Sequence, residues 1–473
     1  MTKGSALKNY LIGDRRFYSH VTAILIPIII QNTITNVVSL LDNVMVGRIG
    51  TLEMSAVAIV NQLLFIFYIC IFGSISGAGI FAAQYAGAGD HDGIRYCFRF
   101  KTYITIGILI SAVTVFLVFP DKLISIYLAE GTPAQETQAT LEFARRYLSV
   151  MLLGLLPFAV SQIYASTLRE IGETTLPMIA SVAAIFVNLI LNYILIFGNE
   201  GLPALSFGPM GVTGAAIATV ISRFAEMLII IVIVGYKKKR FIFAQRLWSS
   251  TKIPIRLTAN IIKKGTPLLI NEFLWSLGTA MLLQCYSVRG LEAVAATNIM
   301  QTAANLFNVV FLSIGNAIAI MIGQQLGSGK TEEAKLSVWR LLSLTVMSCV
   351  VMGSVMLILA PFIPQLYNTT EQIQHTATEL LDVVAVAMPL LGFSHSCYFI
   401  LRSGGKTFIT MLFDCVFMWG VSFTTAFVLA NYTDIPLIPL YAIVQALELI
   451  KCIIGFILVK KGVWVNNMVT NNA

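Results

Sequence analysis

The residue best suited to ion chemistry near the start of the chain is Asp42, a carboxylate inside a long apolar stretch. Val38, Leu40, Leu41 and Val44 surround it, and no basic residue lies on a neighbouring helical turn. Such surroundings disfavour the charged carboxylate unless a cation binds. Asp42 is therefore a candidate for binding H⁺ or Na⁺ in alternation. The alternative is an acidic residue at a helix end that reaches the water of the lipid headgroups.

The second half of the chain has its own ionisable residues within apolar stretches, namely Glu272, His395 and Asp414. Polar groups inside a membrane span need either a partner or a function. A buried Glu and a buried Asp near a His could exchange protons or attract a cationic compound. We favour such a role for Glu272, weigh it evenly against a structural role for Asp414, and favour a structural role for His395.

These side chains must be positioned by helices in a lipid bilayer. Of 473 residues, 57% are hydrophobic and only 11% are charged, whereas soluble domains carry about 25% charged residues. A run of about twenty apolar residues crosses the hydrocarbon core as a helix, and about twelve such runs predict an all-α polytopic membrane protein. The predicted spans are 20–46, 53–83, 100–119, 143–167, 176–197 and 211–234, then 266–288, 292–322, 341–360, 380–401, 408–430 and 436–459.

The two halves of the chain repeat one another in sequence. An even number of spans in each half gives both halves the same orientation, as in parallel repeats about an axis along the membrane normal. We predict six-helix lobes at residues 1–236 and 265–473, joined by a basic cytoplasmic linker at 237–264. The repeated residues are Pro27, Gln84, Gly87 and Gly89 with Pro267, Gln324, Gly327 and Gly329, and Leu168, Arg169, Gly172 and Thr174 with Leu401, Arg402, Gly405 and Thr407.

Lys and Arg concentrate in alternate loops between the predicted spans, for example at Arg95, Arg99 and the run 237–240. The positive-inside rule predicts that these loops and both termini lie in the cytoplasm. We expect the protein in the inner (plasma) membrane. This distribution accounts for the net charge of +8 without a nucleic-acid partner. The seven Cys include no C-x-x-C pair, and no metal or cofactor framework is visible.

Four motifs, taken in order, resemble those of the bacterial multidrug and toxic compound extrusion (MATE) family. They are NVVSLLDNVMVG at 36–47, GAGIFAAQYAGAGD at 77–90, LREIGETTLP at 168–177 and GVTGAAIAT at 211–219. The resemblance implies two lobes around a central cavity that alternate between inward-open and outward-open states. It also implies export of small organic compounds, amphipathic and often cationic, in exchange for H⁺ or Na⁺ as the coupling ion. No other cofactor is expected, and we expect a monomer.

The same resemblance implies a cation site formed by Asp42, Asn188, Asn192 and Thr219. Asn188 and Asn192 are four residues apart and share a helix face, but the family usually has Asp at the second position. The missing carboxylate should weaken binding of Na⁺, which could still contact Asp42 and Asn188, more than an H⁺ relay through Asp42. The alternative role for these Asn residues is hydrogen bonding between helices.

Further residues are expected to shape or brace the helices. Pro27 and Pro267 each remove a backbone hydrogen bond and predict a helix kink, which in related proteins is linked to movement of the first helix. Two pairs of opposite charge, Arg223 with Glu226 and Glu448 with Lys451, are three residues apart, so each pair can neutralise itself on one helix face.

Two other functions compete with ion-coupled multidrug efflux. A lipid-linked glycan flippase of the same superfamily should line its cavity with several basic residues. Only Arg223 and Lys451 lie well inside the predicted spans, because Lys101, Arg145 and Arg146 lie at span ends. A membrane enzyme would need a convergent catalytic site, and four scattered His without an H-E-x-x-H or G-x-S-x-G motif argue against one. We therefore predict a secondary antiporter and not an enzyme.

Overall fold

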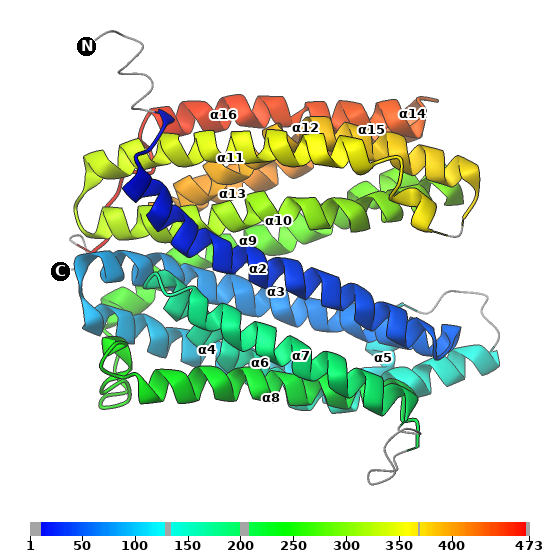
Figure 1. The fold of residues 1–473 in the computed structure, drawn as a ribbon, viewed down its shortest axis with the longest axis horizontal. Coiled ribbons are helices and arrows are strands. Elements are labelled where there is room, and N and C mark those ends of the chain that lie inside the picture. The colour runs from blue at the N-terminus through cyan, green and yellow to red at the C-terminus, as the bar shows by residue number, and fades with distance from the viewer. Residues whose placement is uncertain (1–10, 128–133, 199–207, 368, 470–473) are drawn as a thin grey trace. The chain divides into compact units, whose positions relative to one another are not determined.

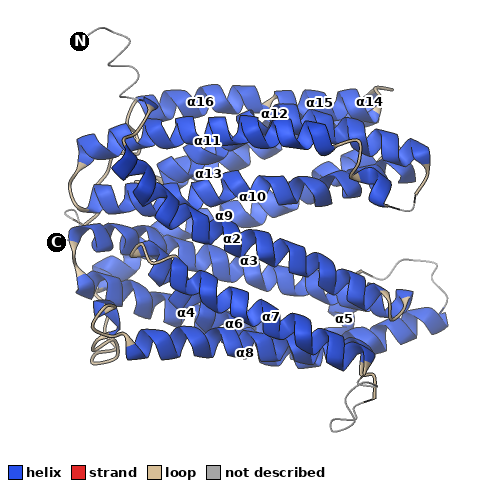
Figure 2. Cartoon of the chain, viewed as in Figure 1, coloured by secondary structure: helices blue, strands red, loops and turns tan. Residues whose placement is uncertain are grey.

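The computed structural model describes residues 11–127, 134–198, 208–367 and 369–469, and every regular element in this part of the chain is helical (Figure 2). Within these described residues, twelve helical segments are long and apolar enough to cross a membrane. This confirms the predicted all-α polytopic fold.

The spans of the first half are six long helices. They are α2 (Arg15–Gly47), α3 (Thr51–Ala88), α4 (His91–Val118), α6 (Ala134–Glu170), α7 (Thr175–Phe197) and α8 (Gly211–Tyr236), with the short α5 (Pro120–Ser125) between α4 and α6. Residues 237–254 follow α8 and contain the short helix η1 (Ile242–Ala244).

The spans of the second half begin with four long helices and end with two interrupted ones. The long helices are α9 (Ile255–Ser287), α10 (Leu291–Gly327), α11 (Thr331–Leu359) and α12 (Glu371–Ser403), with η2 (Pro364–Leu366) before α12. The eleventh span consists of α13 (Thr407–Met411), two π-helical segments, η3 (Leu412–Val416) and η4 (Met418–Phe423), and α14 (Thr424–Tyr432). The twelfth consists of α15 (Leu437–Ala446) and α16 (Glu448–Lys460).

The helices form two compact units (Figure 1). The N-terminal unit comprises Ile30–Gly79 and His91–Thr258, and the C-terminal unit comprises Met1–Ile29, Ile80–Asp90 and Ala259–Ala473. The start of α2 and the end of α3 therefore belong with the second half of the chain. Apolar side chains from the start of α2 pack in one core with α10, α11 and α12.

The repeated glycines build a close crossing between the end of α3 and the end of α10, inside the C-terminal unit. A Cβ atom on Gly87 would lie 1.9 Å from the carbonyl oxygen of Gln324, and one on Gly327 would lie 1.9 Å from that of Gln84. Only glycine permits backbones to approach so closely. This reciprocal contact therefore explains why Gln and Gly recur at equivalent positions of the two halves.

The segment after α16 packs onto this same crossing. Gln84 is fully buried, and its Nε2 donates to the carbonyl oxygens of Ser403 and Asn466, both at 3.1 Å. Its Oε1 accepts from the backbone N–H of Met468 at 2.7 Å. Trp464 and Met468 are both buried as well. The C-terminal segment is thus an integral part of the C-terminal unit.

In the N-terminal unit, α4 binds the segment that follows α8. Arg95, Arg99 and Tyr103 are spaced by four along α4, and each donates hydrogen bonds to backbone carbonyl oxygens of residues 242–252. Phe98, on the same helix, contacts the rings of Phe243 and Trp248. Three helical turns of α4 therefore hold this basic segment in place.

Pro27 and Pro267 lie inside α2 and α9, each of which continues as a helix on both sides of its proline. The expected kinks remain predictions.

Candidate functional site

Three helices of the N-terminal unit bring the four predicted cation-site residues together. Asp42 comes from α2, Asn188 and Asn192 from α7, and Thr219 from α8. Asn192 Nδ2 donates to Asp42 Oδ1 at 2.7 Å and to Asn188 Oδ1 at 3.1 Å. Asn188 Nδ2 donates to Thr219 Oγ1 at 3.4 Å. Both asparagines are buried and Asp42 is half-buried, so the carboxylate is enclosed mainly by neutral amides.

The two amides suit a carboxylate that changes its charge. If the Asn188 amide is turned over, its Nδ2 lies 3.2 Å from both carboxylate oxygens of Asp42; in the other orientation an oxygen faces them. An amide can thus offer a donor to the charged carboxylate or an acceptor to its protonated form. The buried Asn192 Oδ1 makes no hydrogen bond within the described part of the chain. The cluster can therefore accommodate a proton or a small cation at Asp42.

A second polar group lies in the same unit. Gln31 Nε2 donates to Ser181 Oγ at 2.8 Å, and Ser181 Oγ donates to Glu226 at 2.5 Å. Arg223 pairs with Glu226 at 3.3 Å, which confirms the predicted ion pair on one face of α8. The Arg223 guanidinium also lies 5.0 Å from the centre of the Phe158 ring.

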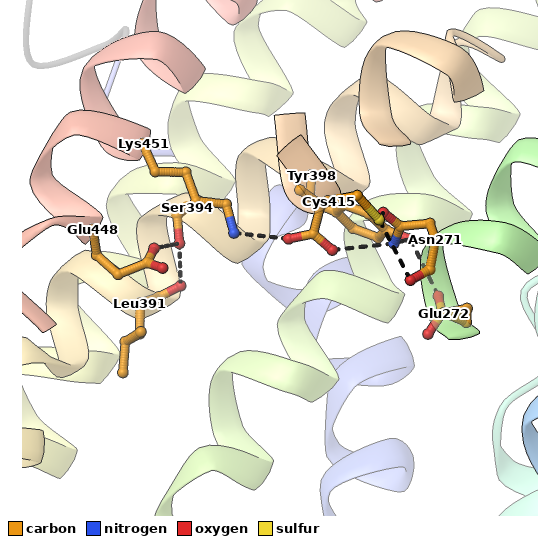
Figure 3. Close-up of polar contacts among 9 residues, drawn as sticks. Asn271, Glu272, Leu391, Ser394, Tyr398, Cys415, Glu448 and Lys451 are labelled. Carbon is orange, nitrogen blue, oxygen red and sulfur yellow. Dashed lines mark hydrogen bonds and ion pairs between the residues drawn. The ribbon is translucent and has the colours of Figure 1, made fainter. Parts of the chain in front are cut away.

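In the C-terminal unit, Asp414 is the centre of a buried network, and Figure 3 shows its partners Asn271 and Lys451. Lys451 Nζ donates to Asp414 Oδ1 at 2.7 Å, and Asn271 Nδ2 donates to Asp414 Oδ2 at 3.1 Å. Cys415 Sγ lies 3.1 Å from Asn271 Oδ1. Asp414 and Cys415 belong to the π-helical segment η3, and π-helical turns are frequent at functional sites.

Glu272 lies next to Asn271 in sequence and joins the same network through Tyr398. Tyr398 Oη donates to Glu272 Oε1 at 3.2 Å and accepts from Asn271 Nδ2 at 3.3 Å. Arg402 Nη1 is 4.0 Å from Glu272 Oε1. The structure thus connects the two predicted acids, Glu272 and Asp414, through one amide and one phenol.

His395 lies among aromatic rings near this network. Its ring centre is 5.4 Å from that of Phe311 and 4.9 Å from that of Phe399. The buried Nε2 makes no hydrogen bond within the residues that the structure describes. No hydrogen bond or ion pair joins the described His395 side chain to Glu272 or Asp414, which fits a packing role better than proton exchange with either acid.

The predicted pairing of Glu448 with Lys451 on one helix face is wrong. Lys451 contacts Asp414 instead, and Glu448 accepts from Ser394 at 3.0 Å. The physical reason is that the first turn of α16 lies beside two other elements. Glu448 reaches Ser394 of α12, and Lys451 reaches Asp414 of η3. Three-residue spacing permits an ion pair but does not compel one.

Sequence reasoning did not assign Asn271, Tyr398 or Arg402 to this network. Arg402 belongs to the repeated Leu-Arg motif and Asn271 adjoins Glu272, which are signals that could have pointed to them. No signal in the sequence indicates that Lys451 binds Asp414. Within the described residues, no group of three or more His, Cys, Asp or Glu side chains could hold a metal ion.

The matches with known proteins extend over most of the chain. The family model described as MatE matches residues 27–194 and 267–428, one segment in each half. This match, together with the twelve membrane-spanning candidates found among the described residues, identifies a polytopic membrane transporter. The chain belongs to the MATE family, whose members are transporters and not enzymes.

Similar proteins are found among curated and solved ones. The probable multidrug resistance protein NorM of Thermotoga maritima is 25% identical over 442 residues, which cover 92% of this chain and 90% of that protein. The probable multidrug resistance protein YoeA of Bacillus subtilis is 25% identical over 427 residues, covering 88% and 87%. An outward-facing multidrug resistance MATE family transporter of the MOP superfamily matches with a TM-score of 0.84 at 19% identity, covering 98% of both chains.

Proposed function

We propose that this protein is a multidrug antiporter that exports amphipathic or cationic organic compounds in exchange for H⁺ or Na⁺ by alternating access. An external ion binds at Asp42 or at the Glu272 network, weakens binding of the organic compound, and is released inside. Of the two ions, we favour H⁺ at Asp42. Membership of the MATE family and the names of its relatives, NorM and YoeA, support efflux of such compounds.

The observation that carries the proposal is the environment of Asp42. One carboxylate lies among buried amides, and one of its oxygens already accepts a hydrogen bond from Asn192 at 2.7 Å. A proton needs only the remaining oxygen of Asp42. Na⁺ is a hard cation that is held by several oxygen ligands, and its binding weakens as carboxylates are lost. This difference favours H⁺ as the coupling ion in the N-terminal unit.

Transport in liposomes tests the proposal. Purified protein is reconstituted, and uptake of a fluorescent lipophilic cation is measured with an imposed pH gradient or an imposed Na⁺ gradient, each without the other. We expect the pH gradient to drive transport, and Asp42→Asn to reduce that transport at least about tenfold, as expected for the loss of an intramembrane ion site. A matched control is Glu292→Gln, which removes an exposed carboxylate at the start of α10.

Two results would contradict this scheme. Full gradient-driven transport by a variant that carries both Asp42→Asn and Glu272→Gln would exclude both acids as coupling sites. Transport by the wild type at an equal rate with no ion gradient would exclude antiport itself.

Location and assembly complete the proposal. We propose that the protein is a monomer in the plasma membrane. We also propose that both termini lie in the cytoplasm, because basic residues concentrate in alternate loops. Labelling of single cysteines in intact cells would test the orientation, and light scattering of the purified protein would test the assembly.

A further inference from the structure

Lys451 is a cation that the protein itself places in its C-terminal polar network. Its Nζ lies 2.7 Å from Asp414 Oδ1, and both side chains are 12% exposed. The ammonium also lies 5.5 Å and 5.7 Å from the ring centres of Phe413 and Phe417. Aromatic faces attract cations, so the site has the composition expected of one that holds an organic ammonium ion.

Asp414 has little capacity left for another cation. Lys451 occupies one of its oxygens, and the other accepts from Asn271 Nδ2 at 3.1 Å. Asn271 is itself fixed by Tyr398 Oη and by Cys415 Sγ. Each carboxylate oxygen of Asp414 thus accepts a hydrogen bond from a side chain of the protein.

Glu272 differs from Asp414 in this respect. Its side chain is 21% exposed, and the nearest cationic group, Arg402 Nη1, is 4.0 Å away. No Lys or Arg nitrogen of the described residues approaches Glu272 as closely as Lys451 approaches Asp414. The network therefore presents one partly exposed carboxylate, which pairs with Arg402 only at 4.0 Å, and one that Lys451 neutralises at 2.7 Å.

Lys451 pairs with Asp414 although an acidic residue on its own helix is also within reach. Glu448, three residues earlier on α16, accepts from Ser394 instead, although a pair at this spacing is sterically possible. Lys451 reaches across to η3, where the π-helical segment places Asp414.

We propose that Lys451 is a specificity-determining residue that restricts the C-terminal unit to organic compounds with one positive charge, because its ammonium neutralises Asp414. This inference deepens the proposed function, since it concerns the charge of the compounds that the same transporter binds. Removal of the ammonium leaves two carboxylates in one network, connected through Asn271 and Tyr398. Such a network should bind compounds with two positive charges.

Two related dyes measure this preference. Ethidium has one positive charge, and propidium has the same ring system with a second, quaternary ammonium. Equilibrium binding of each dye to purified protein at pH 8.5 gives a ratio of affinities that does not depend on ion coupling or transport. We expect Lys451→Met to raise the ratio of the propidium affinity to the ethidium affinity at least about tenfold. The reason is that the negative charge of Asp414 is then no longer neutralised by the ammonium.

Two further variants keep the test independent of protein stability. The double variant Lys451→Met with Asp414→Asn removes both charges and should restore a ratio near that of the wild type. Asp414→Asn alone leaves the ammonium without its carboxylate and should lower the ratio below that of the wild type. A melting curve of each purified variant shows that folded protein is being compared.

The outcomes separate this inference from the proposed function. If the wild type binds ethidium and Lys451→Met leaves the ratio unchanged, the inference is overturned and the proposed function stands. If the wild type binds ethidium and propidium equally well, the inference is overturned and the proposed export of cationic compounds stands. If no variant binds either dye, both are overturned.

Discussion

At the scale of single residues, Asn192 determines what Asp42 can hold. Its amide donates to one carboxylate oxygen at 2.7 Å and offers a single oxygen in return. An aspartate at this position would offer two oxygens and a second negative charge. We therefore attribute the expected preference for H⁺ over Na⁺ in the N-terminal unit to this one side chain.

Asn192→Asp should give the transporter a dependence on Na⁺. Two carboxylates within hydrogen-bonding distance repel each other unless a proton or a cation lies between them. We expect a Na⁺ gradient at constant pH to drive transport by this variant, with an apparent affinity for Na⁺ about tenfold above that of the wild type. Uptake of a fluorescent cation into liposomes at several Na⁺ concentrations measures the change.

The control for this variant adds the same charge elsewhere. Asn298→Asp lies at an exposed position of α10 and should leave the response to Na⁺ as in the wild type. An equal gain in both variants would show that net charge, and not the Asp42 cluster, is responsible.

Lys101 is a second residue whose surroundings allow a clear prediction. It is fully buried in α4, pairs with Glu170 at 2.5 Å, and donates to Ser166 and Thr167. Lys101→Met should lower the free energy of unfolding by about 3 to 5 kcal/mol, because it removes the buried ammonium that pairs with the Glu170 carboxylate. Melting temperatures in detergent measure the loss.

A surface pair provides the contrast for Lys101. Lys335→Met breaks the exposed pair with Glu332 and should change the melting temperature very little, since such pairs contribute about 0 to 1 kcal/mol. Equal effects of the two substitutions would show that the Lys101 pair is not a buried structural contact.

Sequence reasoning located several ionisable residues of the site but not the partners that define their chemistry. Asp42, Glu272 and Asp414 are conspicuous because charged side chains are costly in a membrane. Asn271, Tyr398 and Lys451 become informative only when α9, α12, η3 and α16 are placed together. A partner on another helix depends on packing, and the spacing of one chain does not reveal it.

At the scale of elements, the crossing of α3 and α10 relies on the absence of two side chains. A Cβ atom at Gly87 or at Gly327 would lie 1.9 Å from a backbone carbonyl oxygen of the other helix. Backbone atoms cannot move aside as a flexible side chain can. The crossing therefore has no tolerance for alanine.

Gly87→Ala should separate the two helices and destabilise the C-terminal unit. We expect a fall in melting temperature that corresponds to about 1 to 3 kcal/mol, the usual range for overpacking. The matched control is Gly107→Ala on α4, where an added Cβ meets nothing within 4 Å and should be neutral or slightly stabilising. A similar fall in both variants would contradict the close crossing.

Helix ends were predicted less well than helix number. For example, α4 begins at His91 and α11 at Thr331, nine or ten residues before the predicted spans at 100 and 341. Hydropathy marks the part of a helix inside the hydrocarbon, whereas the helix continues through polar residues that hydropathy does not detect. The π-helical segments of the eleventh span and the interruption at Leu447 leave no periodic signal in the sequence.

At the scale of the whole molecule, residues that are far apart in the sequence meet in the C-terminal unit. Gln84 accepts from Met468 N–H, which is 384 residues away in sequence, and donates to Asn466 and Ser403. The segment after α16 thus stabilises the end of α3 through hydrogen bonds to Gln84.

Truncation after Gly462 should destabilise the protein through the contacts of Gln84. We expect the truncation and Gln84→Leu each to lower the melting temperature. Their combination should lower it by less than the sum, because both remove the same hydrogen bonds. As a control, Gln365→Leu, at an exposed position that bonds only within its own turn, should add fully to the truncation. Additive effects of the truncation and Gln84→Leu would show that the tail acts elsewhere.

The contact between Gln84 and Met468 also orders events during synthesis. The ribosome makes Gln84 within the first fifth of the chain, and α3 must wait until nearly every other residue has been translated before these hydrogen bonds can form. A nascent chain that extends to Val463 contains every described membrane helix but lacks these hydrogen bonds. A chain that ends before Met468 therefore differs from one that contains it in how the end of α3 is held.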